Sequence, residues 1–282
     1  MARTLRILPG LLVCVLFVAV VVGPLVSVAG VGSYFISAQL PGYVITTLSL
    51  KSALAPLPGV FETLPMSGQV NIPLWSLKYE VFCYAILSLT AVLGVWRRSV
   101  LFWSSFALLC VIYFVVESGH GRVAEHVTID QVPRFLLCFF LGAAAYRGRH
   151  VLRLTPLGAF AAIVALVVAR RTGLEEFISY VGVGYLSLCI AALPMGQMRR
   201  VFSRSDLSFG LYIYGWPIAQ TIFLFWPSMG GTELAITSLA ITAVAASLSW
   251  LFVESPAVRL KHHVIPMLSF ERWRPNRLKI IK

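Results

Sequence analysis

Long apolar runs separated by short charged segments constrain this chain more than any other feature of its sequence. A helix crosses a hydrocarbon core about 30 Å thick with about 20 residues, and most of the runs reach that length. The chain is 59% apolar and only 12% charged, about half the charged share of a soluble domain. We therefore predict an all-α, polytopic membrane helical bundle with about eight transmembrane helices. The runs occupy residues 7–29, 74–95, 99–117, 132–146, 152–169, 177–194, 207–227 and 234–253, and 132–146 is the weakest by length.

Basic clusters alternate with these runs and set the predicted orientation. They precede the first run and follow the second, fourth, sixth and last, whereas the intervening loops carry no net positive charge. Because positively charged loops stay in the cytoplasm, we predict that both termini are cytoplasmic. The transmembrane domain then covers 1–259, and 260–282 is a basic cytoplasmic tail near anionic membrane lipid. The same clusters explain the net charge of +12, so we expect no nucleic acid as a partner.

Two further patterns concern the polar loops and the cysteines. The loop 117–130 holds His120 and His126 with three acids, but the spacing matches no zinc motif. All five cysteines lie in apolar runs and form no C-x-x-C pair, which indicates buried apolar side chains. We expect no metal and no bound cofactor.

The longest external stretch, residues 30–73, is rich in glycine and proline and is predicted to be an external loop or cap. Its middle, Tyr43 to Leu54, is apolar enough for an interfacial helix or a re-entrant segment. A simple ordered loop is the alternative.

The second apolar run contains an acid, Glu80, near its beginning. An ionisable group at the centre of a spanning helix costs about 2.5–3.5 kcal/mol and usually faces a partner or a wet cavity. Ser76 and Tyr84 lie four residues from Glu80 in either direction, so they share its helix face and can hydrogen-bond it. Glu80 is therefore either part of a functional site or the partner of Arg134 in an ion pair that packs two helices.

The seventh run holds three aromatic residues, Tyr212, Tyr214 and Trp216, just before Pro217. Proline removes a backbone hydrogen bond and kinks the helix, which frees a carbonyl. The aromatic side chains either contact a sugar or an acyl chain or pack in the interior.

The last run ends in Glu254-Ser-Pro256-Ala-Val-Arg259. Pro256 is expected to end the helix, and Arg259 can pair with Glu254. By itself this segment indicates only a helix terminus.

Taken together, four motifs resemble the bacterial membrane-bound acyltransferase-3 family, the envelope polysaccharide O-acyltransferases. Each motif is weak alone, but their order and spacing fit over nearly the whole chain up to about Arg259. The motifs are Arg3-x-x-Arg6-Ile7-x-Pro9, Leu74-Trp-Ser-Leu-x-x-Glu80-x-x-x-Tyr84, Leu207-Ser-x-Gly-x-Tyr-x-Tyr-x-x-Pro217 and Glu254-x-Pro256-x-x-Arg259.

The resemblance implies an enzyme of the bacterial cytoplasmic (inner) membrane. Such an enzyme moves an acyl group, commonly acetyl, from a cytoplasmic acyl-CoA to a hydroxyl of an exported or lipid-linked carbohydrate. Arg3 and Arg6 match family arginines and are candidates for binding the donor phosphates, and Glu80 matches the acid of the Leu-Trp-Ser motif. Candidates for acceptor binding or for a structural role are Trp75, Ser76, Tyr84, Arg134, Tyr212 and Trp216.

Two departures from the family pattern define the alternative. Family members usually carry two further spanning helices upstream, the first with the histidine expected to act as general base, and this sequence starts after them. Gly215 also stands where members often have a histidine. The alternative is a catalytically inactive truncated remnant or a non-enzymatic membrane partner. A transporter is less expected, because we find no paired broken helices in related halves.

Overall fold

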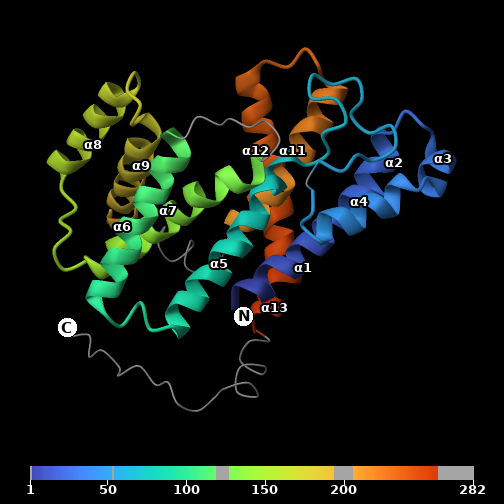
Figure 1. The fold of residues 1–282 in the computed structure, drawn as a ribbon. Coiled ribbons are helices and arrows are strands. Elements are labelled where there is room, and N and C mark those ends of the chain that lie inside the picture. Colours follow the sequence, from blue (N-terminus) through green and yellow to red (C-terminus); the bar gives the residue numbers. More distant parts are fainter. Residues whose placement is uncertain (1, 53, 119–126, 194–205, 260–282) are drawn as a thin grey trace. The chain divides into compact units, whose positions relative to one another are not determined.

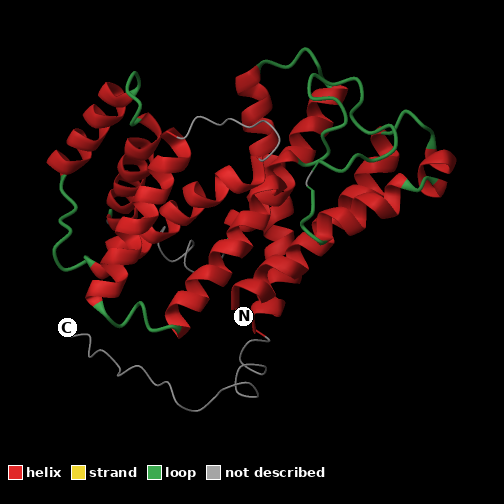
Figure 2. Ribbon diagram, viewed as in Figure 1, coloured by secondary structure: helices red, strands yellow, loops and turns green. Residues whose placement is uncertain are grey.

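The computed structural model describes residues 2–52, 54–118, 127–193 and 206–259, without the side chains of 2–6 and 127–130. Within these ranges the chain is helical and has no β-strand, as Figure 2 shows, apart from one isolated bridge between Ser27 and Val60. The prediction of an all-α fold is therefore confirmed for the described residues. The chain divides into two compact units, residues 1–75 with 200–282 and residues 76–199.

The first unit contains the beginning and the end of the chain. Its α-helices are α1 (Ala2–Phe17), α2 (Gly23–Val26), α3 (Val31–Ile36), α4 (Gln39–Leu48), α11 (Ser208–Phe225), α12 (Gly231–Ser249) and α13 (Ser255–Arg259). Two π-helical segments, η1 (Val18–Val22) and η3 (Trp250–Glu254), join α1 to α2 and α12 to α13, and the 3₁₀ segment η2 (Ile72–Ser76) ends this part of the chain. The helices α11 and α12 form the most extensive helix pair, and α1 contacts α4, α11, η3 and α13.

The described part of the second unit contains five helices, which Figure 1 shows in teal, green and yellow. They are α5 (Leu77–Val92), α6 (Ser99–Ser118), α7 (Val127–Arg147), α8 (Pro156–Ala169) and α9 (Glu175–Ala192). α7 contacts α5, α6 and α9, while α8 packs on α9.

Each predicted apolar run contains a helix, and four helical segments in the described ranges are long and apolar enough to cross a membrane. The four segments are Ile7–Val26, Ser99–Ser118, Glu175–Ala192 and Gly231–Arg259. α8 is apolar but shorter, with 14 residues. By length and composition these four segments are candidate membrane spans, while the count of eight spans and the cytoplasmic termini stay predictions.

The middle of the external stretch 30–73 forms a helix, α4, that begins earlier than the predicted segment Tyr43–Leu54. α4 contacts α1, beside which it lies in Figure 1. Its buried side chains, Tyr43 and Thr47, are one turn apart and therefore share one helix face. The stretch is not a simple loop at this point.

The π-helical segment η1 leaves one carbonyl, that of Ala19, without its usual helical donor. The Gly23 N–H bonds to the Val18 carbonyl instead, and Pro24 has no N–H to offer. The hydroxyl of Tyr34 donates to the Ala19 carbonyl at 2.6 Å, and burial raises the pKa of Tyr34 to about 12, so this donor keeps its proton. A Cβ at Gly23 would overlap the Tyr34 hydroxyl, so glycine is required for this contact.

The last helix does not end before Pro256, so that expectation was wrong. The helical segment continues from Gly231 to Arg259 through η3 and α13. In η3 the Ser255 N–H bonds back to the Trp250 carbonyl, and Pro256 then falls in the first turn of α13. A proline is tolerated in a first turn, because its missing N–H is not needed there.

Candidate functional site

Glu80 lies in the first turn of α5 rather than at the centre of a spanning helix. Its carboxylate is half-buried and accepts a hydrogen bond from the Tyr84 hydroxyl, 2.6 Å from Oε1. The prediction that Tyr84 shares the face of Glu80 and bonds it is therefore confirmed. An acidic side chain is favoured in the first turn of a helix by the helix dipole, so this position suits Glu80 better than the helix centre would.

Arg134 has two acidic partners, neither of which is Glu80. Its Nη2 lies 2.8 Å from Glu117 at the end of α6 and 3.3 Å from Glu176 in the first turn of α9. The expected Glu80–Arg134 ion pair was therefore wrong. The competing acids stand at helix ends that pack around α7, where one guanidinium serves both carboxylates.

Aromatic contacts fix the orientation of α5 on α7. Tyr79 is buried and stacks on Phe135 with ring centroids 5.0 Å apart, and Tyr84 meets Phe139 edge-on at 5.2 Å. Tyr84 thus contacts α7 through its ring and Glu80 through its hydroxyl. Trp75 and Ser76 precede α5 in η2, and Trp75 is 40% exposed.

In the first unit, Pro217 frees the Ile213 carbonyl of α11, as a proline in a helix is expected to do. Two side chains from distant segments donate to that oxygen: Asn71 Nδ2 at 2.8 Å and Cys14 Sγ at 3.2 Å. Asn71 and Cys14 are both buried. The Ile213 carbonyl therefore joins α1 and the segment before η2 to one point of α11.

Tyr212 and Trp216 donate their hydrogen bonds to the same segment of backbone. The Tyr212 hydroxyl bonds the Pro73 carbonyl, and Trp216 Nε1 bonds the Gln69 carbonyl at 3.0 Å. These two side chains, one helical turn apart, hold residues 69–73 on α11. Both polar groups thus contact protein backbone in this structure, and the Tyr212 ring stacks on Phe209 of the same helix.

The structure also singles out Glu254, whose sequence context indicates only a helix terminus. Glu254 is 0% exposed and accepts a hydrogen bond from Ser249 Oγ, 3.0 Å from Oε1. One signal could have found it: Glu254 is the only ionisable residue between Glu233 and Arg259.

The helix α1 lies directly against this buried carboxylate. A Cβ at Gly10 would stand 3.4 Å from the Glu254 Cγ and 2.9 Å from the Phe209 ring, so the missing side chain makes the close approach possible. Arg3 and Arg6 belong to the first two turns of α1, but their side chains lie outside the description. α13, which carries Arg259, packs on the same helix.

The predicted site residues thus fall in both units. The first unit brings the helix of Arg3 and Arg6 together with α11 and Glu254, and the second contains Glu80, Tyr84 and Arg134. The loop with His120 and His126 lies outside the described residues. Among the described side chains there is no group of three or more potential metal ligands.

Four helical segments in the described ranges that are long and apolar enough to span a bilayer point to the class of membrane proteins, and comparison with known proteins is more specific. The acyltransferase domain of the acyltransferase-3 family matches residues 1–254, so the chain belongs to that family and is a membrane acyltransferase by class. It is similar to Nodulation protein 10 of Rhizobium leguminosarum bv. viciae, with 25% identity over 93% of this chain and 76% of that protein. No solved structure matches the chain.

Proposed function

We propose that this protein moves an acyl group, acetyl in the first instance, from a cytoplasmic acyl-CoA to a hydroxyl of a cell-envelope or exported carbohydrate. The observation that carries the proposal is the acyltransferase domain, which extends from residue 1 to residue 254 and so includes the first three motifs and Glu254, the first residue of the fourth. The protein then works in the bacterial cytoplasmic membrane with a carbohydrate or lipid-linked sugar as acceptor.

The reaction exchanges one bond to the acyl carbon for another. The acceptor hydroxyl oxygen attacks the thioester carbonyl carbon, an ester bond forms, the carbon–sulfur bond breaks, and the hydroxyl proton ends on the released thiol. A hydroxyl is a weak nucleophile, so a base that takes its proton contributes about 10²–10⁴-fold. Glu80 is our candidate, because it is a half-buried carboxylate held by a neutral donor, Tyr84, and not neutralised by Arg134.

Arg3 and Arg6 are our candidates for binding the donor. Arginine binds phosphate oxygens in pairs of charge-assisted hydrogen bonds, and the CoA phosphates carry several negative charges. The position of these arginines at the beginning of α1 supports the assignment, since the positive cluster there is predicted to face the cytoplasm, where the donor is.

The test is transfer of radiolabelled acetyl from acetyl-CoA to envelope carbohydrate in membranes that contain the full chain. We expect transfer to depend on the chain, and Arg6→Gln to raise the KM for acetyl-CoA at least tenfold. Arg98→Gln, a change in another basic cluster, is the matched control and should leave KM unchanged. A folded chain that transfers no label to any acceptor would favour the non-enzymatic membrane partner instead.

A further inference from the structure

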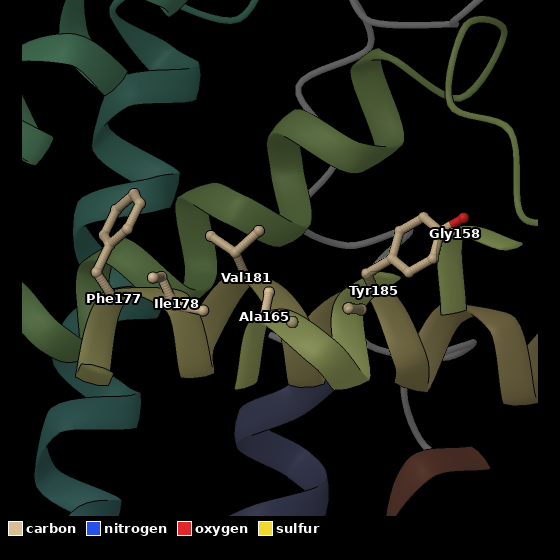
Figure 3. A pocket seen from close by; sticks show the side chains of 8 residues that line it. Gly158, Ala165, Phe177, Ile178, Val181 and Tyr185 are labelled. Carbon is tan, nitrogen blue, oxygen red and sulfur yellow. The ribbon is translucent and has the colours of Figure 1, made fainter. Parts of the chain in front are cut away.

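A groove of about 450 Å³ lies between α8 and α9 in the second unit. Figure 3 shows Phe177 at one end and Tyr185 with Gly158 at the other, and Ile178, Val181 and Ala165 between them. The Tyr185 hydroxyl is the only polar side-chain group among the residues that line it. A groove of this kind suits a hydrocarbon chain and offers almost nothing to a polar ligand.

The groove exists because the residues facing it are small. Gly158, Ala162 and Ala165 of α8 oppose Gly182 of α9, where a Cβ would already crowd Leu166 at 3.1 Å. The outer side of α8 is apolar and strongly exposed, as at Leu157 (77%), Phe160 (64%) and Val168 (68%). In a membrane protein such a surface faces lipid, so the groove opens to lipid as well.

The end of the groove at Tyr185 is tied to a basic loop. The Tyr185 hydroxyl donates to the Arg153 carbonyl at 2.9 Å and accepts from the Thr155 N–H at 3.2 Å. A Cβ at Gly158 would overlap that hydroxyl, so glycine is needed for the Tyr185 ring to close this end. The backbone of Arg153 is therefore held at the mouth of the groove.

The segment that forms this mouth carries positive charge and no acidic residue of its own. The sequence has no acidic residue between Asp130 and Glu175. Arg147 bonds the Trp96 carbonyl and Ser99, and Arg149 bonds the Tyr146 carbonyl, whereas the Arg153 side chain is exposed with no partner in the described part of the chain. The other end differs, because Glu175 and Glu176 there balance Arg170 and Arg171.

We propose that this groove binds one acyl chain of an anionic membrane phospholipid whose phosphate lies at Arg153. The apolar lining fits the chain, and the basic mouth fits the headgroup. Basic pockets at the ends of membrane helices bind anionic headgroups in this way, through charge-assisted hydrogen bonds in a region of low dielectric constant. The site is independent of the acyl-transfer proposal and involves none of its residues.

The first test uses the full chain in detergent with equal amounts of phosphatidylglycerol and phosphatidylcholine, and native mass spectrometry to count bound lipid. We expect phosphatidylglycerol to be retained about tenfold over phosphatidylcholine, and Arg153→Gln to bring that ratio close to one. Arg98→Gln is the control for a general loss of positive charge. Equal retention of the two lipids by the unchanged protein would overturn the headgroup assignment.

The second test asks whether the acyl chain lies in the groove. Phosphatidylglycerol with a photoreactive group in its acyl chain should crosslink to peptides within 156–185 of the unchanged protein. Ala165→Phe fills the groove and should reduce this crosslinking at least fivefold, whereas Val167→Phe, a change of an exposed valine on the opposite face of α8, should not. Absence of crosslinks in the unchanged protein would mean that another segment or a second copy covers the groove. Inorganic phosphate should not compete, and competition would indicate a phosphate site without an acyl-chain site.

Discussion

Glu80 and Glu254, the two acids of greatest functional interest in this chain, differ in their burial and in their hydrogen-bond partners. Glu80 accepts a hydrogen bond from a neutral hydroxyl, that of Tyr84. Arg134, the alternative partner of Glu80, forms its ion pairs with Glu117 and Glu176. Glu254 is fully buried and accepts a hydrogen bond from the Ser249 hydroxyl of the preceding turn. Spacing along one helix predicted the Glu80–Tyr84 bond. The ion pairs of Arg134 join separate helices, and periodicity within a helix does not specify them.

The first prediction at the residue scale concerns Glu80. Glu80→Gln keeps the size of the side chain and leaves both pairs of Arg134 intact, so we expect normal amounts of protein. The rate of ester formation in membranes should fall about 10²–10⁴-fold, the usual contribution of a general base. Glu62→Gln, a change of an exposed acid, is the control. A rate equal to that of the unchanged protein would contradict the assignment of Glu80 as base. If Glu80→Gln lowered the amount of protein and adding Arg134→Gln restored it, the Glu80–Arg134 ion pair would be supported instead.

The second prediction concerns the hydroxyl that bonds Glu254. Ser249→Ala removes a donor from a buried carboxylate, which costs about 1–3 kcal/mol. We expect a lower thermal unfolding midpoint in detergent than for Ser247→Ala, whose hydroxyl bonds only the Ala243 carbonyl of its own helix. Equal midpoints for the two variants would show that Ser249 does not stabilise Glu254.

At the scale of the elements, proline and π-helical turns free carbonyls that distant segments then bind. The Ile213 carbonyl accepts hydrogen bonds from Asn71 and Cys14, and the Ala19 carbonyl accepts one from Tyr34. The sequence predicted the helices from their apolar runs and predicted that Pro217 frees a carbonyl. It did not predict which side chains donate to the freed Ile213 carbonyl, because Asn71 and Cys14 lie far from Ile213 in the sequence. The π-helical turn in the last span also explains why Pro256 did not end the helix.

A double-mutant cycle tests this role of Pro217. Asn71→Ala takes a donor from the buried Ile213 carbonyl and should cost about 1–3 kcal/mol of unfolding free energy. Pro217→Ala restores a backbone N–H four residues after Ile213, so Asn71→Ala should cost about 1 kcal/mol less in that background. Unfolding of the four proteins by denaturant in detergent measures the coupling. Strictly additive costs would mean that the proline does not determine the need for Asn71.

At the scale of the whole molecule, the predicted eight spans and cytoplasmic termini follow from charge rather than from packing. Labelling of single cysteines with an impermeant outside reagent, in a variant without the native cysteines, tests them. We expect cysteines near Arg98, Arg149 and Arg200 to be protected from the reagent, because basic loops stay inside. Cysteines near Glu62, Glu125 and Glu176 should react with it. Labelling from outside at any of the first three positions would overturn the span count.

The central claim is that this membrane protein acylates a hydroxyl of envelope carbohydrate. The most direct measurement is mass spectrometry of envelope carbohydrate from cells that lack the protein, that make it, and that make Glu80→Gln at the same level. We predict base-labile acetyl esters that appear with the unchanged protein and fall to the background level with Glu80→Gln. Identical ester content in all three kinds of cell, with the protein folded in the membrane, would contradict the account.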